Sequence, residues 1–207
     1  MKMKDEIIAN IEAKVIAPPP IIVSFKECSY DSTNNRYLVE SSVKTINFAK
    51  LTKRLGHKEE RKSADALSLT DNKVFLIEFK AGNQVNHENK VSRLISGVSG
   101  KINGSDETLR NDVFAKCFPK ESDYPKISFY LVIDSKEIGA DIYARELARL
   151  SLGATTNDYE RTLYERVLPD LKSNCTFADH FCDIDIWYSE LFDTYLRMNN
   201  IISMDIS

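Results

Sequence analysis

Residues 63–82 read SADALSLTDNKVFLIEFKAG and contain two apolar runs separated by Asp71 and Asn72. Both separating residues tolerate the positive φ of a two-residue type I′ turn, so this stretch predicts a β-hairpin. With that turn, Thr70 faces Lys73 and the pairing continues until Asp65 faces Glu78 at the far end. The hairpin is therefore expected to place two carboxylates directly opposite each other.

Side chains alternate along a strand, so Lys80 is expected on the same face as Glu78. Two like charges facing each other across strands cost about 0.2 to 1 kcal/mol, and more where water is partly excluded. A divalent cation would relieve this repulsion, and carboxylate and carbonyl oxygens are the ligands that Mg²⁺ prefers. A nearby lysine could hold an attacking water or offset phosphoryl charge, so this pattern indicates metal-assisted phosphodiester hydrolysis.

These residues resemble the PD-(D/E)xK nuclease superfamily, which has an acid on one strand, E-x-K on the next and then a helix. Asp65 matches the first acid, with Ala64 where the family name has proline, and Glu78-Phe79-Lys80 matches E-x-K. The resemblance spans about residues 41–134. It implies a restriction-endonuclease-like core with Asp65, Glu78 and Lys80 as catalytic residues. It also implies that Asp65, Glu78 and the Phe79 carbonyl bind Mg²⁺ or Mn²⁺ while Lys80 assists the water.

The E-x-K string alone has little weight, because it occurs four times in the chain. Only the occurrence at Glu78 ends an apolar strand whose expected partner strand places an acid opposite it. The alternative interpretation is that these charges mark the point where the strands meet water. Asp65 and Lys80 would then form an exposed ion pair, which contributes little to stability.

Further residues could complete such a site. Glu40, just ahead of a helix expected at 42–55, is a candidate third acid, and Glu12 on the first helix is another. Basic residues near the hairpin and on the downstream helix are candidates for nucleic-acid binding through phosphate neutralisation. They are Lys53, Arg54, Lys58, Lys62, Lys90 and Arg93. The alternative is that each of these acidic and basic residues is simply a solvated charge on the protein surface.

Hydrophobic periodicity along the rest of the chain predicts an α/β fold, a mixed central β-sheet flanked by helices. We expect a single domain over 1–207, with the nuclease-like core at about 41–134 and a C-terminal helical and strand addition at 135–207. Helices are expected at 4–16, 42–55, 91–102, 106–118, 135–150, 157–168 and 189–198. Strands are expected at 21–25 paired with 36–39, at 127–133 as a doubly buried central strand, and at 181–187.

The net charge of −3 excludes neither a nucleic-acid binder nor an interaction protein, but the charge is unevenly distributed. Residues 1–133 contain 21 basic and 17 acidic side chains, whereas residues 134–207 contain 7 and 14. The four cysteines form no C-x-x-C pair, and no apolar stretch is long enough for a signal peptide or a membrane span. These features predict a cytoplasmic protein that does not enter a membrane.

The sequence thus predicts a metal-dependent nuclease, with DNA favoured over RNA and a role in bacterial or phage defence implied by the resemblance. The alternative is a catalytically inactive, nuclease-like interaction protein. In that case the acidic C-terminal part would bind a basic protein partner or a second copy of the chain as a homodimer. Uptake of Mg²⁺ or Mn²⁺ distinguishes the two hypotheses.

Overall fold

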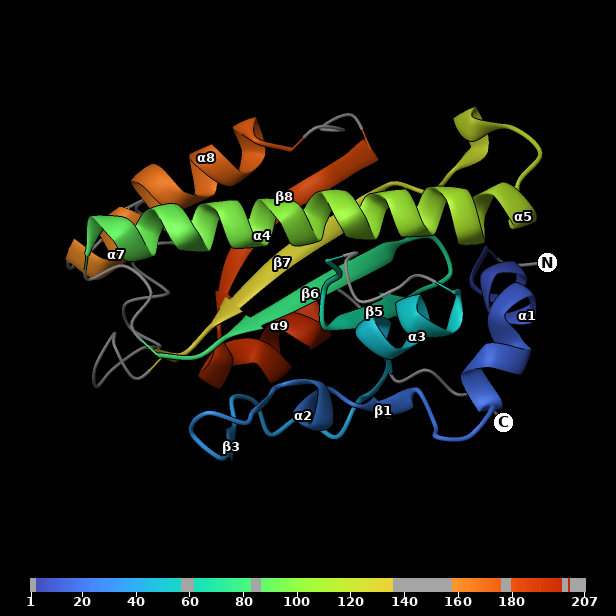
Figure 1. Cartoon of the computed structure of the whole chain (residues 1–207), viewed down its shortest axis with the longest axis horizontal. Helices are drawn as coiled ribbons and strands as arrows, with labels where there is room; N and C mark the ends of the chain where they lie inside the picture. The colour runs from blue at the N-terminus through green and yellow to red at the C-terminus, as the bar shows by residue number, and fades with distance from the viewer. Residues whose placement is uncertain are drawn as a thin grey trace.

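The computed structural model describes residues 3–56, 62–82, 87–135, 158–175, 180–198 and 201. Within these residues a six-stranded sheet forms the centre of the molecule (Figure 1). Its strands, in spatial order, are β1 (Ile22–Ser24), β4 (Lys44–Asn47), β5 (Ala66–Leu69), β6 (Val74–Lys80), β7 (Ile127–Ile133) and β8 (Phe181–Tyr188). Pairing is antiparallel from β1 to β6 and parallel from β6 to β8, so the sheet is mixed as predicted.

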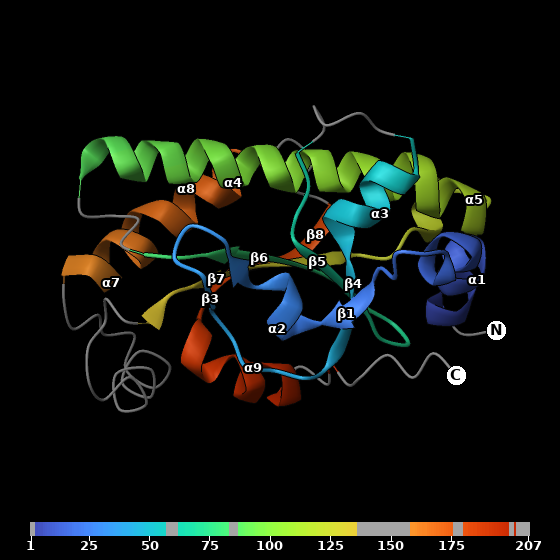
Figure 2. The same ribbon diagram turned by 60° about the horizontal axis from the view of Figure 1, so that its bottom comes forward.

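Helices cover both faces of this sheet. Figure 2 shows the sheet nearly edge-on, with α4 (Glu88–Thr108) and α8 (Leu168–Ser173) on one side and α9 (Phe192–Met198) on the other. The other α-helices are α1 (Met3–Ile16), α2 (Phe25–Cys28), α3 (Phe48–Arg54), α5 (Ala115–Cys117) and α7 (Asp158–Thr162). Short π- and 3₁₀-helical segments are η1 (Leu109–Phe114), η2 (Glu121–Asp123), η4 (Leu163–Val167) and η6 (Ser189–Leu191). None of the described helices has the length and apolar character needed to cross a membrane.

The predicted hairpin is present in the expected register, but neither Asp71 nor Asn72 has a positive φ, so the predicted type I′ turn is wrong. Leu69 pairs with Val74 and Ala66 with Ile77, and the Thr70 amide donates to the Lys73 carbonyl at 3.0 Å to close the turn. Both strands are buried apart from Lys80. The β7 strand is buried along its whole length between β6 and β8, which confirms the predicted central strand.

The predicted pairing of 21–25 with 36–39 is wrong. β1 pairs with β4 instead, and Arg36–Tyr37 (β3) forms a small separate hairpin with Tyr30–Asp31 (β2). The chain leaves β1 early because Ser24 caps α2, accepting a hydrogen bond from the Glu27 amide in a capping box. This turn redirects the chain before a hairpin with 36–39 can form.

The helix predicted at 42–55 begins only at Phe48, after strand β4. Asn47 caps it by accepting the Lys50 amide at 2.9 Å. The preceding residues pair on both sides, with Ile46 opposite Ile22 and Leu67. The β-branched residues Thr45 and Ile46 therefore pair with neighbouring strands, and this pairing outweighs the tendency of Ser41 or Ser42 to cap a helix at this point.

The helices predicted at 91–102 and 106–118 form one helical run from Glu88 to Cys117, because η1 joins α4 to α5 without a break. The helix predicted to stop near Pro169 continues to Ser173, since the π-helical η4 changes the hydrogen-bonding register just before the proline. The predicted first helix, last strand and last helix are confirmed as α1, β8 and η6 with α9. The helix predicted at 135–150 lies, after Ser135, outside the described residues.

Candidate functional site

The two acids of the hairpin meet where β5 and β6 end. The Asp65 amide donates to the Ile77 carbonyl at 3.0 Å just before β5 begins, which holds Asp65 beside the end of β6, although the paired register itself ends at Ala66 opposite Ile77. The Phe79 amide donates to Asp65 Oδ2 at 2.9 Å and fixes the carboxylate at this position. The structure therefore brings together the carboxylates that the sequence placed face to face.

Glu78 is completely buried. Burial, followed by the nearby charge of Asp65, raises the pKa of Glu78 to about 7, although Lys101 and Lys80 act in the opposite direction. Near neutral pH this side chain is therefore divided between its protonated and ionised forms.

Lys101 of α4 lies between the two acids and was not predicted as part of the site. Its Nζ is 3.1 Å from Asp65 Oδ1 and 2.7 Å from Glu78 Oε2. Burial lowers the pKa of Lys101, but the charges of Glu78 and Asp65 oppose this and the net shift is upward. A sequence signal did exist, since Lys101 directly precedes Ile102 on the buried stripe of α4 and so borders the face that packs on the sheet.

Lys80 completes the charge cluster. Its Nζ is 2.7 Å from Glu78 Oε1, and its carbonyl accepts the Asp134 amide at 3.0 Å, which holds the end of β6 against the chain leaving β7. Two carboxylates thus face two ammonium groups. Glu78 Oε1 is buried and accepts no bond with hydrogen-bond geometry from the described residues, although the ammonium groups of Lys80 and Lys101 each lie 2.7 Å from it.

The cluster lines a cavity of about 300 Å³. The other wall of this cavity is formed by α2 and the β2–β3 hairpin. The lining residues are Cys28, Ser29, Tyr30, Asp31, Ser32, Leu38, Asp65, Glu78, Phe79, Lys80, Ala81 and Lys101. Burial raises the pKa of Cys28 to about 12, so its thiol stays protonated and is a poor nucleophile.

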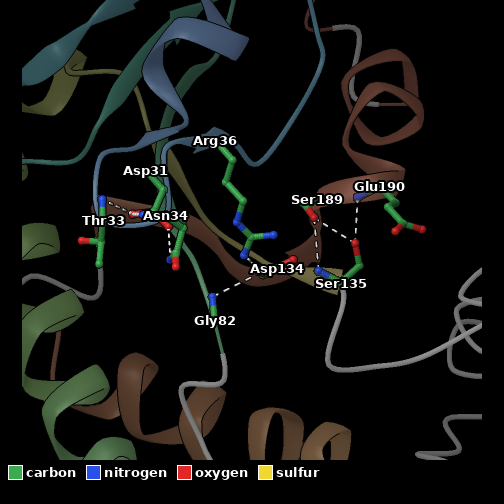
Figure 3. Close-up of polar contacts among 9 residues, drawn as sticks. All are labelled: Asp31, Thr33, Asn34, Arg36, Gly82, Asp134, Ser135, Ser189 and Glu190. Atoms are coloured by element: carbon green, nitrogen blue, oxygen red, sulfur yellow. Dashed lines mark hydrogen bonds and ion pairs between the residues drawn. The ribbon is translucent and has the colours of Figure 1, made fainter.

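Polar contacts hold the β2–β3 hairpin over this end of the sheet (Figure 3). Arg36 of β3 forms an ion pair with Asp134, which follows β7 and is almost completely buried. The Gly82 amide donates to the same Asp134 oxygen at 3.3 Å. The turn itself is closed by Asp31, whose carboxylate accepts the Thr33 amide at 3.0 Å and the Asn34 side-chain amide at 2.6 Å. The Asp31 carboxylate therefore stabilises this turn and is not one of the two acids of the charge cluster.

The oxygen atoms at the cluster suit a hard divalent cation. Alternate residues of a strand bond to opposite neighbours, and Lys80 bonds to the β7 side, so the Phe79 amide and carbonyl face the β5 side, where Asp65 lies. A buried carboxylate oxygen without a hydrogen bond, a second carboxylate and this carbonyl fit Mg²⁺ or Mn²⁺. The described residues contain no group of three or more Asp, Glu, His or Cys side chains placed to hold a metal, so water or substrate would complete the shell.

The other candidate residues lie away from the cavity. Glu40 is exposed and pairs with Lys26 at 2.5 Å, and Glu12 is exposed on α1. Lys62 lays its side chain over Gly100 of α4, and Arg54 donates to the Lys14 carbonyl. The remaining candidates Lys53, Lys90 and Arg93 are exposed on α3 and α4, and Lys58 lies outside the described residues.

A second cavity, of about 280 Å³, lies near the start of β7 and contains none of the predicted site residues. Its lining includes Asp106, which is fully buried, and His180, whose Nδ1 is 3.1 Å from Asp106 Oδ2. Neither residue belongs to a short motif, and they are far apart in the sequence, so only the fold reveals this pair.

Comparison of this chain with protein-family models, with curated proteins and with solved structures finds no match.

Proposed function

We propose that this chain is an Mg²⁺-dependent nuclease with a restriction-endonuclease-like core. The observation that supports this most directly is the position of Asp65 and Glu78, whose carboxylates both contact Lys101 Nζ and lie beside Lys80 in one cavity. This is the arrangement of acids and lysine expected from the resemblance to the PD-(D/E)xK superfamily.

In the proposed mechanism Asp65, Glu78 and the Phe79 carbonyl hold the cation. When bound, Mg²⁺ would polarise the phosphoryl group and lower the pKa of a coordinated water. Lys80 is partly exposed in the cavity, where its ammonium can orient the attacking water and offset charge that develops on the phosphate. Lys101 neutralises the acids in the metal-free protein and can turn to the phosphate once they have another counter-ion.

The charge balance of the cluster predicts that substrate and cation bind together. The two carboxylates are already matched by two ammonium groups, so a divalent ion alone would leave an excess of positive charge. A phosphate group removes that excess. Nucleic acid should therefore tighten Mg²⁺ binding, and by linkage Mg²⁺ should tighten nucleic-acid binding.

We further propose DNA rather than RNA as the main substrate and defence in a bacterium or phage as the setting. The choice of DNA and the setting in defence both follow from the resemblance to the PD-(D/E)xK superfamily. The exposed basic residues of α3 and α4 would contact the backbone outside the cavity.

The test is cleavage of labelled single-stranded and duplex DNA and RNA by the purified chain with Mg²⁺ or Mn²⁺. We expect cleavage that EDTA abolishes, and at least a hundredfold loss in Lys80→Ala, the scale on which removal of one electrostatic catalytic group acts. Lys73→Ala, exposed in the turn at the other end of the β5–β6 hairpin, is the matched lysine control and should cleave at a similar rate. If Lys80→Ala and Asp65→Asn cleave as fast as the parent chain, the proposal fails.

One observation favours the alternative, a nuclease-like interaction protein without catalysis. Lys101 and Lys80 satisfy the two acids internally, so the cluster requires no metal for its stability. Its acidic C-terminal part would then bind a basic partner or a second copy of the chain. Calorimetric titration with Mg²⁺ and Mn²⁺ separates the two, because this alternative predicts no heat of binding to the protein alone and none beyond that of the oligonucleotide when both are present.

A further inference from the structure

We propose that the β2–β3 hairpin is a stacking platform and that the substrate of the adjacent cavity is single-stranded nucleic acid. This inference rests on the proposed function, since it names the substrate of the same site. It concerns two tyrosines, Tyr30 and Tyr37, which we call the tyrosine pair.

The tyrosine pair is exposed although its members are large and aromatic. Tyr30 is 47% exposed and Tyr37 is 43% exposed, and they are two of the four large apolar side chains exposed among the described residues. They face each other across the two short strands, with ring centroids 5.2 Å apart. The hairpin thus displays two adjacent rings to solvent on one face.

The rings are held in place rather than loosely attached. The Tyr30 hydroxyl donates to Asn35 Oδ1 at 2.6 Å, and the Lys26 ammonium lies 4.9 Å from the centre of the Tyr37 ring. Arg36, between the rings in sequence, fastens the hairpin to buried Asp134 (Figure 3). A fixed aromatic surface loses little conformational entropy when a base stacks on it.

The platform adjoins the charge cluster directly. Tyr30 lines the same cavity as Asp65, Glu78 and Lys80. A strand whose base stacks on the tyrosine pair would therefore run with its phosphates toward the cavity. Lys26, which lies over the Tyr37 ring and pairs with Glu40, adds a positive charge beside the platform that can attract the backbone of such a strand.

The shape of the cavity argues against a duplex. Glu78 is completely buried and Asp65 is only 26% exposed, so the scissile phosphate must descend between the sheet end and the β2–β3 hairpin. A cavity of this size is at the small end of ligand sites and has room for about one nucleotide. Bases in a duplex are already stacked on each other, whereas unpaired bases are free to stack on aromatic side chains.

The experiment measures binding by fluorescence anisotropy, with Lys80→Ala as the background so that no probe is cleaved. The probes are fluorescein-labelled oligothymidylate and its duplex with oligoadenylate, both with Mg²⁺ present. We expect the single strand to bind more tightly than the duplex. Tyr37→Ala and Tyr30→Ala should each weaken single-strand binding by about 5- to 100-fold, because stacking contributes on that scale per base.

Two controls separate stacking from damage to the fold. Tyr37→Phe keeps the ring and should bind the single strand nearly as well as the background protein. Ile16→Ala removes a similarly exposed apolar side chain at the end of α1 and should have no effect. Circular dichroism and thermal unfolding check that all variants are folded.

Each result bears on the inference separately from the nuclease proposal. Equal single-strand binding by Tyr37→Ala, Tyr30→Ala and the background protein overturns the platform, as does a preference for the duplex or the absence of single-strand binding. Metal-dependent cleavage would still support the nuclease in those cases. Conversely, tyrosine-dependent binding without any cleavage by the parent chain keeps the platform and removes the nuclease.

Discussion

Glu78 combines complete burial with three charged neighbours, and the balance among them sets the chemistry of the cavity. Lys101 and Lys80 favour its ionised form, whereas burial and Asp65 favour its protonated form, and the second pair outweighs the first. A cation that enters must therefore compete with a proton and with an ammonium group.

The first prediction concerns Lys101, whose Nζ contacts both carboxylates. If this ammonium stands where a metal would bind, Lys101→Met should tighten Mg²⁺ binding by roughly tenfold at about pH 8, above the pKa of Glu78 in the parent chain. Isothermal titration calorimetry measures the change, and Lys90→Met, on the exposed face of the same helix, should leave it unaltered. Unchanged or weaker Mg²⁺ binding in Lys101→Met would show that Lys101 does not hold the cation position.

The second prediction concerns the pH dependence of folding. The pKa of Glu78 is about 7 in the folded chain, above the ordinary value of 4.5. The folded state therefore holds the proton more tightly, and this stabilisation is complete below the ordinary pKa and lost as pH rises through about 7. Glu78→Gln does not titrate, so without metal the parent chain should lose up to about 3 kcal/mol relative to this variant between about pH 5 and pH 8.

Urea unfolding at the two pH values gives this difference. The control is Glu88→Gln, which changes an exposed glutamate paired with Arg166 and should show no comparable pH dependence. A constant difference between the parent chain and Glu78→Gln across this range would mean that Glu78 has an ordinary pKa.

At the scale of elements, the ion pair between Arg36 and Asp134 ties the β2–β3 hairpin to the end of β7 beside the cavity. Arg36→Ala would leave the buried carboxylate of Asp134 without its guanidinium, although the Gly82 amide remains. Because Arg36 is itself 25% exposed, we expect a reduced penalty of about 1 to 3 kcal/mol in the free energy of unfolding. Urea unfolding measures it, and Arg93→Ala, at an exposed position, should cost much less.

Amide hydrogen exchange provides a second readout for this variant. We expect faster exchange at Leu38 and Val39, whose amides bond to Ser29 at the base of the hairpin, in Arg36→Ala but not in Arg93→Ala. The same exchange rates in both variants would show that the hairpin keeps its place without the ion pair.

The elements also show why some features could be predicted and others could not. The β5–β6 register follows from a short turn between adjacent runs, so alternation and loop length were enough to bring Asp65 beside Glu78. β1 pairs with β4 across intervening segments, and local patterns contain no information on that partner choice. Lys101 was missed for a related reason, since its contact with the acids depends on how α4 packs on the sheet.

At the scale of the whole molecule, the sheet changes from antiparallel to parallel pairing at β6, the strand that contains Glu78 and Lys80. The chain beyond residue 134 contributes the edge strand β8 to the same sheet, so the acidic C-terminal part shares the central sheet with the rest of the described chain. The described exposed acids of this part include Asp183, Glu190 and Asp193.

The carboxylates and the ammonium between them reach their places by different routes. A local hairpin brings Asp65 and Glu78 together, whereas Lys101 is 23 residues beyond Glu78 and arrives only with α4. The hairpin itself supplies both acids and Lys80, whereas the second counter-charge depends on how α4 packs on the sheet. The excised hairpin would therefore contain the acids without Lys101, one of their two counter-charges.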